Sequence, residues 1–145
     1  MPEYKDLELK AEIKTTFPDA DIFGVKLVNG RPTKAVIEVT NNEEGPIEVA
    51  YVGGVLLSPH ELPEGAPKSA AVLRNLTAAK FDVTIAPGDK HNVVFNFILD
   101  MNPQDIDLQL VALIADPEGR PFQVEVHRGP ATVVEAPTNF LDPQV

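Results

Sequence analysis

The stretch from residue 72 to residue 99 restricts the fold of this chain more than any other. Within it Phe81, Val83 and Ile85 alternate with polar residues, and this period of two is typical of a strand with one buried face. A turn-forming run, Ala-Pro-Gly-Asp at 86–89, follows. Residues 91–99, HNVVFNFIL, are apolar on both faces, so we expect a strand in the middle of a sheet, covered on both sides. The stretch therefore predicts an antiparallel β core.

The same alternation recurs along the chain, whereas helical spacing of apolar residues does not hold for three turns anywhere. The 14 prolines are spread through the sequence, which also disfavours helices. Gly53-Gly54 indicates a β-bulge or bend that interrupts a strand. Further strands are expected at 7–13, 22–28, 35–39, 47–51, 106–114 and 122–126, the last resuming at 131–135.

Seven or eight short strands separated by turns predict an all-β fold, an antiparallel β-sandwich of the immunoglobulin or fibronectin III type. The chain has no Trp and no Cys, so the antibody-type core of a buried Trp against a disulfide is excluded. A length of 145 residues suits one domain, which we place at residues 1–135. Residues 136–145 contain Pro137 and Pro143 and no periodicity, and are expected to form a tail.

Charge and composition exclude several classes of function. The formal net charge of −10 argues against binding to nucleic acid and to anionic membrane surfaces. Without cysteine there is no thiolate metal site and no cysteine nucleophile. No apolar run reaches the length of a membrane span, and the first residues do not resemble a signal peptide. A secreted or lumenal protein would therefore have lost its signal before this Met1.

No pattern in the sequence predicts catalysis, a cofactor or a metal. The histidines, His60, His91 and His127, lack the spacing of a zinc site, and we expect them at the surface. The two serines, Ser58 and Ser69, lie outside any nucleophile motif, and no phosphate-binding Gly-rich loop is present. Five acids could act as calcium ligands built from loops, but the preferred interpretation is that they keep turns and strand ends soluble: Glu43, Glu44, Asp100, Asp105 and Asp107.

Asn75 is the one residue for which the sequence predicts a covalent modification. Asn75-Leu76-Thr77 is the only Asn-x-Ser/Thr sequon in the chain, and its middle residue is not proline. It precedes the alternating run at 81–85, so we expect it at a strand junction, exposed at the rim of the core. The sequon predicts N-glycosylation of Asn75 if the chain enters the secretory pathway.

Three segments in order give the chain a family resemblance: the strand, Asn-rich turn and strand at 35–49, the Asn-Leu-Thr-Ala segment with its two following strands up to the Phe-rich run, and Pro121-Phe122-Gln123. From about Phe17 to Glu135 the chain resembles the lumenal domain of the translocon-associated protein alpha subunit family, also called signal sequence receptor alpha. The resemblance points to the same sandwich architecture, and the family's sequon falls at the position of Asn75.

The resemblance implies a non-catalytic domain in the endoplasmic reticulum lumen that belongs to a single-pass membrane protein. The implied partners are the Sec protein-conducting channel, other translocon-associated subunits and nascent chains, and the implied role is to assist translocation. The tail at 136–145 would lead to a membrane helix outside this sequence. The alternative is an extracellular adhesion or carbohydrate-binding β-sandwich, with or without calcium, and calcium titration with glycan-array binding separates the two.

Overall fold

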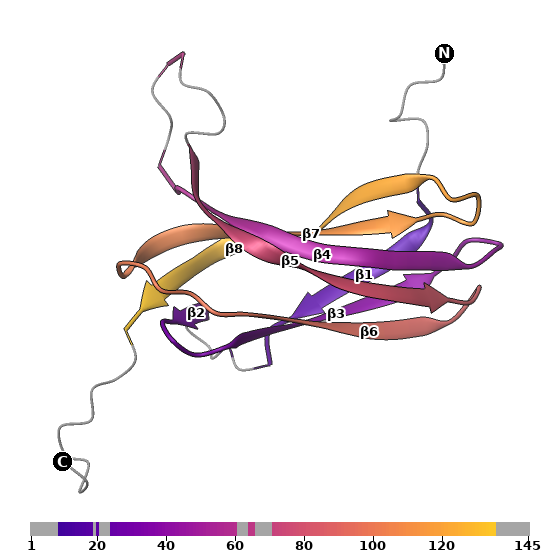
Figure 1. Ribbon diagram of the computed structural model, residues 1–145, viewed down its shortest axis with the longest axis horizontal. Coiled ribbons are helices and arrows are strands. Elements are labelled where there is room, and N and C mark those ends of the chain that lie inside the picture. Colours follow the sequence, from indigo (N-terminus) through magenta and orange to yellow (C-terminus); the bar gives the residue numbers. More distant parts are fainter. Residues whose placement is uncertain (1–8, 19, 21–23, 61–63, 66–70, 136–145) are drawn as a thin grey trace, which may run out of the picture.

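The computed structural model describes residues 9–18, 20, 24–60, 64–65 and 71–135 (Figure 1). This part of the chain forms eight strands and no α-helix, so it has no helix that could cross a membrane. The strands are β1 (Ala11–Thr16), β2 (Val25–Val28), β3 (Thr33–Asn41), β4 (Ile47–Leu57), β5 (Val72–Ile85), β6 (Lys90–Phe97), β7 (Gln104–Ala115) and β8 (Pro121–Val134).

The strands form two sheets. A three-stranded sheet has the order β1-β3-β6, and a five-stranded sheet has the order β2-β8-β7-β4-β5. All pairs are antiparallel except β2 with β8, which is parallel. In immunoglobulin lettering the sheets are A-B-E and A′-G-F-C-C′, so the predicted immunoglobulin-like β-sandwich is confirmed.

The core lies between the inner faces of the two sheets. Ile37 and Phe95 from the smaller sheet, and Leu108, Leu110 and Ile114 from the larger, are at most 1% exposed. The Phe95 and Phe97 rings lie 5.6 Å apart between centroids. These residues are the ones that the alternating sequence placed on one face of a strand, because successive side chains of a strand point to opposite faces.

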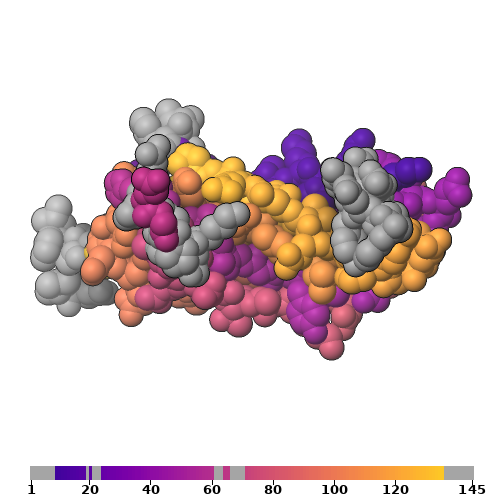
Figure 2. Space-filling model, turned by 90° about the horizontal axis from the view of Figure 1, so that it is seen from above, coloured from indigo at the N-terminus to yellow at the C-terminus, as the bar shows by residue number. Residues whose placement is uncertain are grey.

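The two sheets also meet along one side. The Thr15 hydroxyl of β1 donates a hydrogen bond of 2.6 Å to the Val126 carbonyl of β8. The Phe17 ring packs edge-on against the His127 ring, with centroids 4.7 Å apart. Figure 2 shows β8, in orange and yellow, lying along the length of the molecule with indigo residues of the first strands beside it.

The prediction that residues 91–99 form a central strand covered on both sides is wrong. β6 is the last strand of the three-stranded sheet, and β3 is its only partner within the described residues. One face of the strand is buried, as predicted, but Val94 is 37% exposed and Ile98 is 62% exposed on the other. A second covering layer therefore does not explain why this run is apolar on both faces.

Irregular pairing changes which way several side chains face. A register shift between Val49 and Tyr51 reverses the alternation of β4, so Tyr51 is 42% exposed rather than aligned with Ile47 and Val49 as predicted. The bulge predicted at Gly53-Gly54 is confirmed by a shift in the β4–β5 register, although β4 continues through it. Another shift, between Leu110 and Val111 of β7, places an extra residue in β8, which runs without a break to Val134.

The boundaries of the first strands also differ from the predictions. The strand expected at 7–13 is observed as β1 at Ala11–Thr16, and residues 1–8 lie outside the described part. The strand expected at 22–28 is observed as the four-residue β2, while 21–23 are not described. The predicted tail at 136–145 also lies outside the described residues.

Two buried asparagines fasten the ends of the sandwich. The side-chain amide of Asn41 donates to the carbonyls of Gly45, at 2.8 Å, and of Ile85, at 2.9 Å, while its oxygen accepts from the Glu43 N–H. At the other end the Asn29 amide group donates to the Met101 carbonyl at 2.6 Å and its oxygen accepts from the Met101 N–H at 3.2 Å. Each side chain therefore holds together segments distant in sequence.

Candidate interaction surface

The outer face of the five-stranded sheet carries a hollow of about 540 Å³ over β4, β5 and β7. No other strand in the described part of the chain covers this face. The hollow is open and mixed in character, with Gln109 and Gln123 at its polar part. Its apolar lining comes from Tyr51, Val55, Ala78, Val111 and Leu113.

The two glycines of β4 create the hollow. Gly53 is paired with Val111 of β7, and a Cβ at Gly53 would lie 3.2 Å from the Ala78 Cβ of β5. A Cβ at Gly54 would lie 2.5 Å from the Gln109 carbonyl oxygen. This oxygen belongs to the backbone, so it could not move away without distorting β7. Glycine thus allows close packing on the core side and leaves the opposite face without a side chain, which exposes the floor formed by Val111.

Two of the acidic residues near the hollow have side-chain partners. Lys80 and Asp82 of β5 form an ion pair of 3.3 Å, and the hydrogen bond to Asp82 raises the pKa of Lys80. The Gln109 side chain donates to Glu125 of β8 at 3.4 Å. A surface with an apolar floor and partnered acidic groups at its margin suits contact with another protein better than capture of a small ion.

Asn75 lies beside the hollow. It is exposed and sits inside β5, paired with Val55, so the prediction of a strand junction is wrong. The reason is that β5 begins at Val72, well before the alternating run at 81–85, in a segment whose sequence does not alternate. Directly opposed residues share a face, so Asn75 and Val55 both point outward. N-glycosylation of Asn75 stays a prediction.

The three histidines are far from equivalent. His60 and His91 are exposed, as expected. His127 instead is partly buried against Phe17, and its Nε2 is buried with no hydrogen-bond partner in the described part of the chain. Burial lowers the pKa of His127, and the nearby Glu125 carboxylate offsets only part of this effect.

The acids weighed as calcium ligands do not converge. Asp105 accepts a 2.9 Å hydrogen bond from the Thr132 hydroxyl, and Glu43 accepts one of 2.7 Å from the Lys10 N–H. Among the described residues no three His, Asp or Glu side chains are grouped so that they could hold a metal ion. Of the two serines, Ser58 accepts from the His60 N–H at 3.2 Å, and Ser69 lies outside the described residues.

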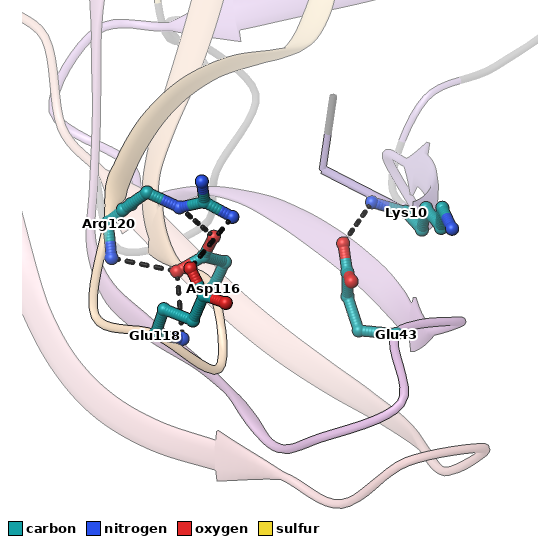
Figure 3. A network of polar contacts seen from close by, with 5 residues as sticks. All are labelled: Lys10, Glu43, Asp116, Glu118 and Arg120. Atoms are coloured by element: carbon teal, nitrogen blue, oxygen red, sulfur yellow. Dashed lines mark hydrogen bonds and ion pairs between the residues drawn. The ribbon is translucent and has the colours of Figure 1, made fainter. Parts of the chain in front are cut away.

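The strongest polar cluster is structural and lies at the β7–β8 turn (Figure 3). Asp116, 6% exposed, accepts from the N–H groups of Glu118 and Arg120 and from the Arg120 guanidinium at 2.7 Å. Burial of the Asp116 carboxyl opposes its ionised form, but the hydrogen bonds and charge of Arg120 outweigh burial and hold the pKa of Asp116 below its usual value. The same pair raises the pKa of Arg120. The cluster closes the turn predicted at 116–119.

Sequence reasoning did not find the hollow because its residues come from four strands. One signal was available: Val111 and Leu113 are apolar on the second face of the strand at 106–114. In a half-buried sheet that face is usually polar, so apolar residues there indicate a surface with a partner.

Neither a protein-family profile nor a curated protein sequence matches this chain. Among solved structures it is similar to the sporulation control protein Spo0M of Bacillus subtilis, with 15% identity, a TM-score of 0.48 and coverage of 90% of this chain and 51% of that one. It is also similar to a PapD-like domain of human CEP192, with 13% identity, a TM-score of 0.48 and coverage of 89% and 88%. A CARDB domain from Pyrococcus furiosus has 12% identity, a TM-score of 0.42 and coverage of 87% and 89%. The fold assignment rests on the strand order of this chain itself.

Proposed function

We propose that this chain is the non-catalytic lumenal domain of a translocon-associated membrane protein of the endoplasmic reticulum. In this role it assists protein translocation at the Sec channel through protein–protein contacts. The resemblance to the alpha subunit family supports the compartment and the partners. The hollow on the outer face of β4, β5 and β7 is the observation that carries the contact role.

The properties of this face support binding to a folded protein or to an extended nascent chain. Tyr51 at its margin is 42% exposed and offers a flat ring with a hydroxyl group, the kind of side chain enriched where proteins meet. Val111 and Leu113 provide an apolar floor. The hollow is shallow and open, so it fits a protein surface rather than a buried substrate.

The location can be tested by purification from native membranes. The full-length protein, tagged and expressed at its natural level in eukaryotic cells, is solubilised in mild detergent and its partners are identified by mass spectrometry. The proposal predicts enrichment of Sec channel subunits over other membrane proteins of the same compartment. A protein that reaches the cell surface, and whose purified domain binds glycans in a calcium-dependent manner, would support the adhesion alternative instead.

A further inference from the structure

β6 is an unprotected sheet edge. Its register with β3 runs over eight consecutive pairs without a shift, so the strand is regular. Residues 91–99 contain no proline and no charged Asp, Glu, Lys or Arg. Free strand edges present unpaired N–H and C=O groups to any extended chain, and proteins usually block them with charges, prolines or bulges.

The other edges in the described part of the chain have such protection. β5 has three register shifts against β4 and carries the Lys80–Asp82 ion pair. β1 has Glu12 and Lys14 on its exposed face. β8 contains Pro130 and a bulge, and β2, the end strand that covers its last four residues, is itself only four residues long. After Lys90, its first residue, which forms an ion pair of 3.4 Å with Glu38, β6 carries no such protection.

The sequence at this edge is symmetric about Asn96. Two residues to either side are Val94 of β6 and Ile98, the first residue after it, both exposed, at 37% and 62%. The alternation of buried and exposed residues continues past the end of β6 to Asp100. One residue to either side are Phe95 and Phe97, both facing the core. In an antiparallel pair of two copies centred on Asn96, Val94 of each copy lies opposite Ile98 of the other, and Phe95 opposite Phe97.

The symmetry continues beyond these positions. Val93 would lie opposite Leu99, and both face the core. Asn92 would lie opposite Asp100, where an amide donor meets a carboxylate acceptor. Because the edge between Lys90 and Asp100 is uncharged, the net charge of −10 is not concentrated where the two copies meet.

We infer that the occupant of this edge is a second copy of the chain. The two β6 strands pair antiparallel around a two-fold axis at Asn96 and join the small sheets into one of six strands, β1-β3-β6-β6-β3-β1. A two-fold contact of this kind is self-complementary and closes, so it stops at the dimer. It brings Val94 of each copy beside Ile98 of the other on the outer face of the joined sheet. An unrelated extended segment would not require a symmetric edge.

Residue 96 faces its own copy only in this register, and charge exchange at this position tests it. The 145-residue chain is produced in bacteria, so that no glycan is attached at Asn75, and its mass is followed by sedimentation equilibrium over a dilution series. The wild type is expected to approach twice the chain mass of 15.7 kDa. Asn96→Asp and Asn96→Lys each place like charges opposite each other and should remain at the mass of one chain.

An equal mixture of Asn96→Asp and Asn96→Lys should recover the dimer, because opposite charges then face each other. Asn42→Lys, which adds the same charge at another exposed asparagine, outside residues 92–100, should dimerise as the wild type does. Circular dichroism melts establish that all variants are folded. A wild type at the mass of one chain throughout, a dimer unaffected by the Asn96 variants, a mixture without recovery, or loss of the dimer in Asn42→Lys each overturns the inference.

Discussion

Among single residues, the buried asparagines Asn29 and Asn41 join distant segments by hydrogen bonds that their sequence context does not predict. The sequence around Asn41 and Asn29 is that of ordinary turns, yet the side-chain amide of each donates to a carbonyl far along the chain, that of Ile85 and that of Met101. Buried amides are costly unless all their groups are paired, and these are paired. They therefore fix which ends of the strands meet.

Asn41→Asp should destabilise the domain strongly. The carboxylate cannot donate to the Gly45 and Ile85 carbonyls, which lose their amide partner, and each unpaired buried group costs about 1–3 kcal/mol. The expected loss in the free energy of unfolding is about 2–6 kcal/mol, measured by chemical denaturation near neutral pH. Asn42→Asp, the same change at the neighbouring exposed residue, should cost less than about 0.5 kcal/mol. Equal effects of the two changes would show that the Asn41 bonds are not important.

His127 should make stability depend on pH. Its folded pKa lies below the usual 6.5, so the unfolded chain binds a proton that the folded chain resists. Stability is then greatest above pH 6.5 and falls as the pH drops from there towards the folded pKa. His127→Phe keeps a ring against Phe17 and removes the titration, so its stability should decline less over this interval.

Denaturation midpoints of both proteins at several pH values from 7.5 down to 5 measure the difference, a range set about the ordinary histidine value of about 6.5. His91→Phe, at an exposed position, is the matched control and should follow the wild-type curve. Parallel curves for wild type and His127→Phe would mean that the buried imidazole is not responsible.

Among the strands, the alternating sequence predicted those whose own side chains alternate without a break, and missed the consequences of bulges. The inner faces of β3 and β7 follow directly from their period of two. The outward turn of Tyr51 depends on a bulge formed with a strand some 30 residues away, which local sequence does not encode. The position of β6 at an edge depends likewise on the pairing of distant strands. An apolar run alone does not distinguish a central strand from an exposed edge strand.

The bulge in β5 leaves one residue in an unusual conformation. Asp82 has a φ of 50°, in the left-handed region, opposite the shift between Val49 and Tyr51. This region costs roughly 1–2 kcal/mol for a residue with a Cβ, least for Asn and Asp. Asp82→Gly should keep or raise the melting temperature, because the exposed ion pair with Lys80 contributes little. Asp82→Val should lower it, since β-branched residues are poorly suited to this conformation.

If Asp82→Val melts at or above the temperature of Asp82→Gly, the left-handed conformation does not determine which residue types position 82 tolerates. Thermal unfolding followed by circular dichroism distinguishes the two results.

The position of Asn75 within β5 leads to a prediction about modification. The side chain is exposed on an edge strand, so a glycan has room and Asn75→Gln should not alter folding. Expression through a eukaryotic secretory pathway should add mass that an N-glycosidase removes, and Asn75→Gln should abolish that mass. A secreted wild-type chain at its peptide mass would contradict the prediction.

In the whole molecule, the sandwich presents two surfaces with different uses. The β6 edge is symmetric and suits a second copy, whereas the hollow on the outer face of the five-stranded sheet is asymmetric and suits a different protein. They belong to different sheets, so a dimer through β6 leaves the hollow's strands outside the paired edge. Composition and strand pattern predicted the sandwich, but not these surfaces, because both depend on the order of strands within each sheet.

The most direct test of the account concerns Val111, at the floor of the hollow. Val111→Lys in the full-length protein should reduce crosslinking to the Sec channel in native membranes, because it places a charge in the apolar contact. Val36→Lys is the matched control: Val36 is likewise a part-buried valine on the outer face of an interior strand, β3, in the other sheet. With both variants folded and expressed equally, we predict loss of crosslinking in Val111→Lys alone. Crosslinking that survives Val111→Lys, or is lost equally in both, would contradict the assignment of this face as the contact surface.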